Sequence, residues 1–596
     1  MKILIPAIPY DDGKSGVSVY LREIITALEE AGHTLTLVVE EDAAPEFNRF
    51  KQIRIRKMPA VFSMLYTLFI LPWRIRWKAF DLCILPAANR RALCRYPVFT
   101  IAVVHDLSQY HVPVKYDRFR MFYIKRILPC FVRKVQAVVA VSCSTKRDLI
   151  EFWRIPEERL QVVYNGFQPL PEPVAPEEKR KQILYVSRIE HPGKNHLNLL
   201  RAFELLPPEL RRIYTLVMPG AAWSGAEKVF DYAKHSPCRD RFRFPGFVRK
   251  EELPELYAQS SMYIFPSLFE GFGLSLLEAM AAGLPCACSR TSSLGELGDG
   301  AAELFDPDSP HEIMQAMRHI LSSPERQQAL CAAGRARAAA FSWRKAADEL
   351  VRIRLRKIAH IFGVSFFTGT MEEALRQLDE LVRSRENHHV AFVNAHCLNL
   401  AYRDNNYRTV LNRCSAVFAD GIGVKIGAKW CGFSVEENVN GTDLFPLLAR
   451  KPYRIYLLGG APGVAQAAMA NARASHPAAE FVGCTDGFFR EKTPEKLFTE
   501  LRTLNPDIVL TAMGVPLQEE WIRRHLEEFP GCVVIGVGGL LDFVSGRIPR
   551  APEWMRKSGL EWCYRLSQEP ARLFKRYIIG NPLFIWRILC NRNRRF

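Results

Sequence analysis

Two glutamates flank a glycine-rich loop in the segment 265–288, FPSLFEGFGLSLLEAMAAGLPCAC. The loop consists of Glu270, Gly271, Phe272 and Gly273. Glu278 follows about one turn into the helix that the apolar pattern predicts after the loop. The first amides of that helix can bind a phosphate, and the two carboxylates can bind sugar and ribose hydroxyls. This set suits a nucleotide sugar, although the spacing alone fits an ordinary helix start with one surface glutamate equally well.

Two cations follow the strand predicted over residues 183–190, ILYVSRIE. Arg188 stands at the end of that strand, and Lys194 stands in the next loop, HPGKN. Isolated cations in a loop are usually only solvated. These two share a lobe with the glutamate loop, so they can neutralise the charge that develops on a departing diphosphate.

A second set of polar residues lies in the second half of the chain. Asp420 directly follows the strand predicted over 415–419 and precedes a helix. An aspartate at this end of a strand lies where open α/β sheets bind ligands, and it can take a proton from an attacking sugar hydroxyl. Aspartate is also a favoured helix cap, so both explanations stay open at this point.

Three further strands in this half end in glycine or polar loops. Gly459 and Gly460 follow residues 454–458 and suit a diphosphate, although the loop is not the G-x-G-x-x-G of a dinucleotide site. Gln518 follows residues 508–513, and two glycines follow residues 533–537. Four strand ends therefore present glycine or polar residues toward one edge of a sheet.

Parallel α/β layers are needed to position these residues. Short β-branched runs alternate with amphipathic helices along the whole chain. A proline-rich linker lies at 167–178, FQPLPEPVAPEE, and a fresh strand pattern starts soon after residue 357. We therefore predict two Rossmann-like lobes, over residues 1–170 and 171–356. A separate Rossmann-like α/β domain follows over residues 357–596, and a basic helical appendage forms its end at about 547–596. The cleft between two such lobes is a favoured place for a nucleotide.

The excess charge lies in two segments. The chain has 596 residues and a net charge of +18, and residues 51–95 and 547–596 carry +9 each. Their apolar runs, 60–73 and 577–589, are shorter than the roughly 18 to 20 residues of a spanning helix. Basic residues beside short apolar runs suit an anionic membrane surface, and the alternative is a core helix with a solvated basic face. Because the amino terminus has no signal-peptide core, we expect a cytoplasmic protein.

Residues 1–356 resemble a retaining glycosyltransferase of family 4 with the two-lobed GT-B architecture. The shared features are the E-x7-E spacing from Glu270 to Glu278, the basic pair, and an amino-terminal glycine loop, Ser15-Gly16-Val17. The resemblance implies that the lobe over residues 1–170 lies on the acceptor side and that the lobe over residues 171–356 binds the nucleotide sugar. The donor contacts that it implies are Gly16, Arg188, Lys194, Gly271, Phe272, Gly273 and Glu278. It implies that Glu270 contacts the transferred sugar and that His105 lies near it, although His105 equally fits a turn. Such enzymes need no metal, so we expect no metal or cofactor.

Residues 357–596 resemble the WecG/TagA/CpsF glycosyltransferases, family 26. The shared residues are Asn394, Asp420 to Gly423, Gly441 to Asp443, Gly514 to Trp521, Arg550 to Pro552 and Gly559 to Arg565. The resemblance implies inversion at a sugar, often N-acetylmannosamine, that is added to an undecaprenyl-diphosphate-linked acceptor. It implies that Asp420 is the general base, that donor or acceptor contacts come from Asn394, Gly459, Gly460 and Gln518, and that the lipid diphosphate meets Arg565, Arg572 and Arg576. Phe392 stands where the family usually has threonine, which leaves the donor sugar open.

We therefore predict a bifunctional glycosyltransferase that builds a bacterial surface polysaccharide. Its expected partners are UDP- or GDP-linked sugars, a polyprenyl-diphosphate glycan and the inner face of the plasma membrane; a homo-oligomer stays open. In the alternative, only one half is active, and the other half docks the enzyme on membrane or acceptor. A nucleic-acid-binding protein is not expected, because no recognised motif accompanies the charge.

Overall fold

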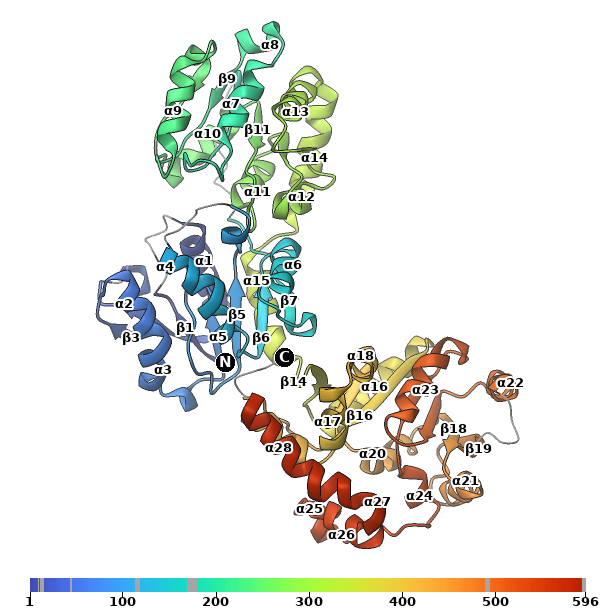
Figure 1. Cartoon of the computed structure of the whole chain (residues 1–596). Coiled ribbons are helices and arrows are strands. Elements are labelled where there is room, and N and C mark those ends of the chain that lie inside the picture. The colour runs from blue at the N-terminus through green and yellow to red at the C-terminus, as the bar shows by residue number, and fades with distance from the viewer. Residues whose placement is uncertain are drawn as a thin grey trace. The chain divides into compact units, whose positions relative to one another are not determined.

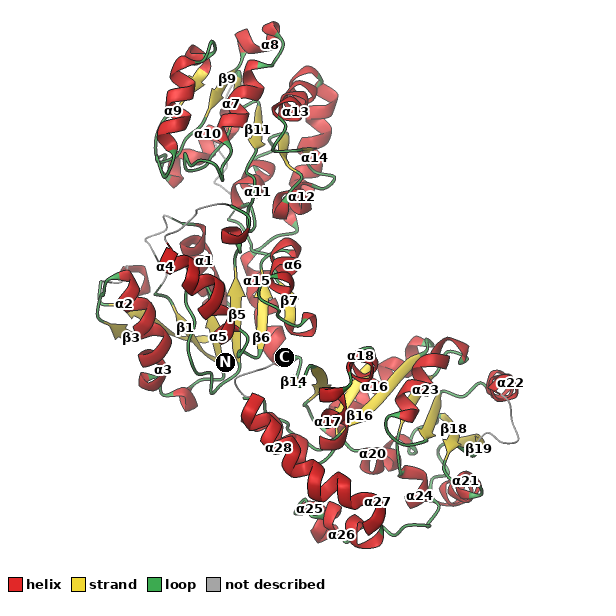
Figure 2. Cartoon of the chain, viewed as in Figure 1, coloured by secondary structure: helices red, strands yellow, loops and turns green. Residues whose placement is uncertain are grey.

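The computed structural model describes residues 1–8, 10, 15–42, 45–112, 118–168, 180–487 and 494–591. The chain forms two compact units, Met1–Ile353 and Arg354–Phe596, in which helices flank parallel sheets (Figures 1 and 2). Most of the predicted linker, residues 169–178, lies outside the described residues. None of the helices in the described part of the chain combines the length and the apolarity that crossing a membrane requires.

The first lobe of the first unit is a seven-stranded parallel sheet. Across the sheet the strands are β3 (Lys51–Ile55), β2 (Thr34–Glu40), β1 (Lys2–Pro6), β4 (Leu82–Leu85), β5 (Thr100–Val104), β6 (Ala137–Ala140) and β7 (Leu160–Val162). The central strands are apolar and buried, as expected of a parallel sheet that is covered on both faces. The helical segments are α1 (Gly16–Glu30), α2 (Ala60–Leu65), η2 (Tyr66–Ile70), α3 (Leu71–Arg74), α4 (Arg118–Phe122), η5 (Tyr123–Ile127), α5 (Leu128–Val132) and α6 (Cys143–Glu151).

The second lobe is a six-stranded parallel sheet. Its strands are β10 (Phe242–Arg243), β9 (Thr215–Val217), β8 (Gln182–Leu184), β11 (Met262–Phe265), β12 (Cys286–Ser289) and β13 (Glu303–Phe305). The helices are α7 (His196–Glu204), α8 (Pro208–Ile213), α9 (Ala226–His235), α10 (Leu253–Gln259), α11 (Leu274–Ala281), α12 (Ser292–Gly298), α13 (Pro310–Ser322) and α14 (Pro324–Ala339). The chain then returns to the first lobe through α15 (Trp343–Leu355), where Trp343 packs on Tyr20 with ring centroids 5.7 Å apart.

The second unit contains one eight-stranded sheet. Its strands are β14 (Ile358–Ile361), β15 (Val364–Phe367), β17 (Ala416–Ala419), β16 (His388–Val393), β21 (Val533–Gly536), β20 (Ile508–Ala512), β18 (Arg454–Gly459) and β19 (Glu480–Thr485). Where the sequence predicts a fresh strand pattern soon after residue 357, the structure has an antiparallel β14–β15 hairpin with its turn at Phe362-Gly363. The other pairings are parallel.

Helices cover this sheet, and an appendage follows it. The covering helices are α16 (Met371–Ser384), α17 (Ala395–Arg403), α18 (Asn405–Asn412), α19 (Ile422–Trp430), α20 (Gly441–Leu448), α21 (Val464–Ser475), α22 (Pro494–Leu504), α23 (Leu517–His525) and α24 (Leu540–Val544). The appendage comprises α25 (Glu553–Lys557), α26 (Glu561–Gln568), α27 (Pro570–Phe574), η10 (Lys575–Ile579) and α28 (Gly580–Asn591). The predicted fold class, twin Rossmann-like lobes followed by a separate α/β domain with a helical appendage, is confirmed.

Candidate functional site

The glycine-rich loop and the basic loop of the second lobe meet at the carboxyl ends of β11 and β8. Lys194 Nζ donates to Glu270 Oε1 at 2.5 Å, and the two side chains are only 19% and 17% exposed. The loops are also joined through the backbone, because Leu268 N donates to Gly193 O at 3.0 Å. The structure therefore brings the expected diphosphate cation and the expected sugar carboxylate into one ion pair.

Two further side chains expected at the donor, Arg188 and Glu278, contact other residues of the second lobe. Arg188 Nη2 is 2.8 Å from Glu190 Oε2, and its guanidinium carbon is 5.2 Å from the centroid of the Trp223 ring. Glu278 Oε2 accepts a hydrogen bond of 3.1 Å from the hydroxyl of Tyr257. Burial raises the pKa of Tyr257, so this hydroxyl stays protonated and orients the carboxylate. The sequence did not indicate Tyr257, because it lies on another helix, α10.

The glycine loop packs directly against the first lobe. A Cβ at Gly271 would lie 2.1 Å from His105 O, so only glycine fits this approach. His105 Nε2 is 2.7 Å from Pro86 O, and burial lowers the pKa of His105 to about 4. Because a carbonyl only accepts, the neutral ring donates from Nε2. Gly16 is the first residue of α1, and a Cβ there would meet nothing within 4 Å.

In the second unit, Asn394 and Asp420 come from neighbouring strand ends. Asp420 N donates to Val393 O at 2.8 Å, across β16 and β17. Asn394 Oδ1 caps α17 by accepting from the two amides of His396 and Cys397 at 3.1 and 3.2 Å. Burial raises the pKa of the Asp420 carboxyl, whereas Arg576, Arg565 and a hydrogen bond from the Asn394 side chain lower it. The expected base thus shares its surroundings with two arginines of the appendage.

Ion pairs hold the appendage against this edge of the sheet. Arg550 Nη2 is 2.6 Å from Asp443 Oδ1, and Arg556 Nη1 is 3.7 Å from the same oxygen. Arg550 Nε also lies 3.8 Å from Glu561 Oε1, and burial raises the pKa of Glu561. The sequence did not reveal this cluster, because Asp443 and Arg550 are 107 positions apart.

Of the three arginines expected at the lipid diphosphate, Arg565 and Arg576 lie near Asp420. Arg565 also lies 3.4 Å from the position of a Cβ at Gly539, in the loop after β21. Arg572 instead pairs with Glu569, at 2.6 Å, on an exposed part of the appendage. Its expected contact with the diphosphate stays a prediction.

The remaining expected ligands support the loops of the same edge. Gly459 has a φ of +119°, and a Cβ there would lie 2.4 Å from Ala512 O, so glycine is required. Gln518 is 2% exposed; its Nε2 donates to Glu519 Oε1 at 2.7 Å and its Oε1 accepts from Gly538 N at 3.1 Å. Burial raises the pKa of Glu519 to about 7. Gln518 therefore connects α23 to the glycine loop after β21, and its contact with substrate stays a prediction.

The last helix has two different faces. Phe584 and Ile588 are buried, and Arg587 Nη1 donates to Asn399 Oδ1 on α17 at 2.7 Å. On its exposed side lie Trp586 and Leu589, which are 60% and 51% exposed, and Ile579 of the preceding η10 is 54% exposed. One face of this segment therefore packs in the core, while the other is apolar and open to solvent, and contact with a membrane stays a prediction.

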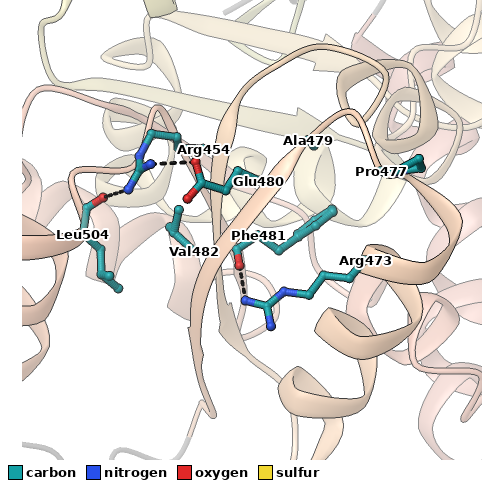
Figure 3. A pocket seen from close by; sticks show the side chains of 8 residues that line it. All are labelled: Arg454, Arg473, Pro477, Ala479, Glu480, Phe481, Val482 and Leu504. Atoms are coloured by element: carbon teal, nitrogen blue, oxygen red, sulfur yellow. Dashed lines mark hydrogen bonds and ion pairs between the residues drawn. The ribbon is translucent and has the colours of Figure 1, made fainter.

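A pocket in the second unit lies away from these residues (Figure 3). Arg454 and Glu480, the first residues of β18 and β19, form an ion pair of 2.6 Å beside it, and Arg473 donates to Phe481 O. Because it lies at the amino ends of the strands, it is separate from the edge that carries Asp420. In the described ranges, no group of three or more His, Cys, Asp or Glu is arranged to hold a metal ion.

Three family models match the chain. The glycosyltransferase family 4 model matches residues 14–169, the glycosyl transferases group 1 model matches residues 167–337, and the WecG/TagA/CpsF family model matches residues 359–596. These matches confirm the two resemblances that the sequence motifs indicated.

Curated relatives match the chain as well. The Escherichia coli O-antigen chain mannosyltransferase B is 28% identical over 262 residues, which cover 42% of this chain and 68% of that protein. The Bacillus subtilis (strain 168) N-acetylglucosaminyldiphosphoundecaprenol N-acetyl-beta-D-mannosaminyltransferase is 32% identical over 187 residues, which cover 31% of this chain and 72% of that protein. Among solved structures, sucrose-phosphate synthase from Thermosynechococcus elongatus matches with a TM-score of 0.48 at 18% identity, over 59% of this chain and 98% of that one.

Proposed function

Because the chain belongs to the WecG/TagA/CpsF glycosyltransferases over residues 359–596 and to the group 1 and family 4 glycosyltransferases over residues 14–337, we propose that it adds two sugars to one lipid-linked glycan. The observation that carries this proposal is that each unit has its own carboxylate beside cations at the ends of parallel strands. These are Glu270 with Lys194, and Asp420 with Arg565 and Arg576. Each unit therefore has the groups that one sugar transfer requires.

In the second unit, Asp420 acts as the general base. Its carboxylate takes the proton of the acceptor hydroxyl while that oxygen attacks the anomeric carbon from the face opposite the leaving diphosphate, which inverts the configuration. Arg565 and Arg576 bind the diphosphate of the acceptor lipid. The matched Bacillus subtilis relative acts, by its name, on an N-acetylglucosaminyl-diphosphoundecaprenol, which supports an acceptor of this class.

In the first unit, transfer retains the configuration of the donor sugar. Arg188 and Lys194 stabilise the negative charge on the departing nucleoside diphosphate, Glu278 binds the ribose and Glu270 contacts the transferred sugar. When the donor binds, its phosphate replaces Glu270 as the partner of Lys194, and its sugar replaces Lys194 as the partner of Glu270. Donor binding therefore separates these two side chains. UDP- or GDP-linked sugars fit this site, and no metal or other cofactor is required.

The enzyme works at the inner face of the bacterial plasma membrane, where it contributes to a surface polysaccharide. The exposed apolar face of α28 and the arginines of the appendage suit an anionic lipid surface. The matched Escherichia coli relative is, by its name, an O-antigen mannosyltransferase, which supports this type of product.

Mass spectrometry of a polyprenyl-diphosphate acceptor, incubated with the full chain and a panel of nucleotide sugars, tests this function. We expect the mass of the acceptor to increase by two sugars when the right pair of donors is present. An acceptor that gains no sugar from any donor pair would rule out the proposed activity, and a gain of one sugar only would favour a single active half.

A further inference from the structure

Helix α12 of the second lobe holds the glycine loop through its first two side chains. Ser292 Oγ accepts from Glu270 N at 3.0 Å, so this hydroxyl binds the backbone of the residue that contacts the sugar in the proposed function. Ser293 Oγ donates to Phe272 O at 2.6 Å and lies 2.9 Å from Glu270 O. A displacement of α12 would therefore move the Glu270 loop with it.

The same helix reaches the first lobe through Glu296. Cys143 N donates to both oxygens of this carboxylate at 3.0 Å, and Ser144 N donates to Oε2 at 3.4 Å. These two residues begin α6, where the helix dipole and the amides of the first turn favour a negative charge. Glu296 Oε1 also accepts from the hydroxyl of Tyr164, which follows β7, at 2.5 Å. One carboxylate of the second lobe therefore binds three donors of the first lobe.

Tyr164 contacts the glycine loop as well. Burial raises the pKa of Tyr164, and the nearby Cys143 and Glu296 raise it further, so the hydroxyl stays protonated and donates to the carboxylate. The centroid of its ring lies 6.3 Å from that of Phe272 in the loop. It also lies 5.6 Å from that of Phe341, in the segment that returns to the first lobe. Tyr164 therefore meets α12 with its hydroxyl and the glycine loop with its ring.

A second contact joins α6 to the glycine loop. His111 Nε2 lies 3.0 Å from Asp148 Oδ1 on α6. The ring of His111 stacks on that of Phe269, with the centroids 4.3 Å apart and the planes at 13°. Phe269 belongs to the second lobe and directly precedes Glu270. The first lobe therefore holds the loop at the residue next to Glu270, and it does so through a side chain that α6 orients.

Helix α6 also supports the backbone against which the loop packs. Thr145 Oγ1 donates to His105 O at 3.2 Å. This is the carbonyl oxygen that a Cβ at Gly271 would approach to 2.1 Å. The amino-terminal residues of α6 therefore bind the Glu296 carboxylate and fix the carbonyl beside Gly271, so the position of the loop in the first unit depends on how α12 docks on α6.

We propose that Glu296 is a positioning residue of the first transfer, because its contact with the amino terminus of α6 holds α12, and with it the Glu270 loop, against the first lobe. The inference rests on the proposed function of the first unit. It gives Glu296 no contact with substrate, since other side chains of this lobe bind the donor. Loss of the contact should therefore act mainly on kcat, because fewer donor complexes have Glu270 in its place beside the first lobe.

Kinetics test this role in a full chain that carries Asp420→Asn, so that only the first transfer is measured. Glu296→Ala removes the acceptor of three hydrogen-bond donors and should lower kcat about tenfold or more, with a smaller change in the KM for the nucleotide sugar. Glu296→Gln keeps one acceptor oxygen and should give an intermediate kcat. The matched control is Glu209→Ala, which removes the same charge from an exposed position on α8 of the same lobe and should keep the kinetics of the parent. If Glu296→Ala has the kcat of the parent, the inference is wrong.

A double-mutant cycle across the two lobes separates positioning from a local structural role. Tyr164→Phe removes the hydroxyl and leaves the ring against Phe272, so kcat should fall several-fold. In the Glu296→Ala protein the same substitution should change kcat little, because the hydroxyl has lost the carboxylate through which it acts. If the two effects on kcat multiply in full, the residues act separately and the proposed contact does not position the loop.

Amide hydrogen exchange of the full chain detects the same contact without turnover. In Glu296→Ala, peptides from residues 142–149 and 265–273 should exchange faster than in the parent, since the amino terminus of α6 and the glycine loop both lose support. Peptides from α9 should exchange as in the parent. Unchanged exchange over residues 265–273 would show that Glu296 only caps α6, which overturns the positioning role alone. If the exchange changes as expected but the parent transfers no sugar, the proposed function alone is overturned.

Discussion

The two carboxylates that we assign to chemistry are held in different ways. Glu270 lies in an ion pair with Lys194, in which each charge satisfies the other until a donor binds. Asp420 is surrounded by protein, which raises its pKa, and arginines of the appendage limit that rise. The first arrangement suits a side chain that changes partners, and the second suits a base that must accept a proton.

Asp420→Asn should lower the rate of the second unit by about 10²- to 10⁴-fold, because the amide keeps the shape of the side chain but cannot accept a proton. In the parent, this transfer should become faster as the pH rises through the pKa of Asp420, which lies above that of an ordinary aspartate. The control is the transfer by the first unit in the same protein, which should not change. A second-unit rate near that of the parent would exclude Asp420 as the base.

Lys194→Met should weaken the first unit by about 10- to 100-fold in kcat/KM for the nucleotide sugar. The change removes a cation from the diphosphate and leaves the Glu270 carboxylate without its partner. Lys228→Met is the matched control, since Lys228 is an exposed lysine on α9 of the same lobe. Equal kinetics for the two variants would show that Lys194 has no role in donor binding.

At the level of helices and strands, much of the arrangement could be predicted from the sequence. β-Branched runs followed by glycine or acidic loops mark the ends of parallel strands, and these ends meet at one edge of a sheet. This pattern predicts the strand before Asp420 and the helix after Gly273, and the structure has both. Local periodicity carries this information, because each element buries one face or one run of its own residues.

Contacts between distant segments could not be predicted. The ion pair of Asp443 with Arg550 and the hydrogen bond from Tyr257 to Glu278 depend on how whole elements pack, and no local pattern specifies that. The burial of Gln518 is a further case, since a polar side chain after a strand is expected at the surface. The sequence of α28 is apolar on both sides, so it does not indicate which face of the helix packs inward.

Glu519→Gln should change how stability depends on pH. Burial raises the pKa of Glu519 from 4.5 to about 7, so its neutral form is favoured in the fold. The stabilisation it provides is present below about pH 4.5 and is lost as the pH rises through about 7. The amide never ionises, so the variant should be more stable than the parent by up to about 3 kcal/mol near pH 8 and similar to it near pH 4.

Denaturant unfolding at several pH values measures this effect in the second unit. Glu527→Gln removes the same charge from an exposed residue that is not among the charges acting on the pKa of Glu519, and it should keep the pH dependence of the parent. If Glu519→Gln also leaves that dependence unchanged, Glu519 does not ionise in this range.

For the whole molecule, the net charge of +18 reflects two local surfaces rather than a generally basic protein. One segment, residues 51–95, lies in the first lobe and includes the exposed apolar side chains of α2, η2 and α3. The other, residues 547–596, includes arginines near Asp420 and the apolar outer face of α28. Removing the last helix is a poor test of membrane attachment, since Phe584 and Ile588 pack in the second unit.

Substitution on the exposed face of α28 tests attachment without disturbing the core. Trp586→Ser with Leu589→Ser should weaken sedimentation with anionic vesicles, because each exposed apolar side chain contributes to insertion at the interface. The control is Phe247→Ser, which removes an aromatic side chain that is 71% exposed in the second lobe. Unchanged sedimentation of the double variant would place the attachment elsewhere.

The presence of two working sites in one chain is tested most directly by the mass of a polyprenyl-diphosphate glycan after incubation with both donors and the full chain. The parent should add two sugars. Glu270→Gln should prevent the transfer by the first unit, and Asp420→Asn should prevent the transfer by the second, so neither variant should yield the product with two sugars. If either variant converts the acceptor to that product as fully as the parent does, the substituted carboxylate is not needed and the chain does not work through two such sites.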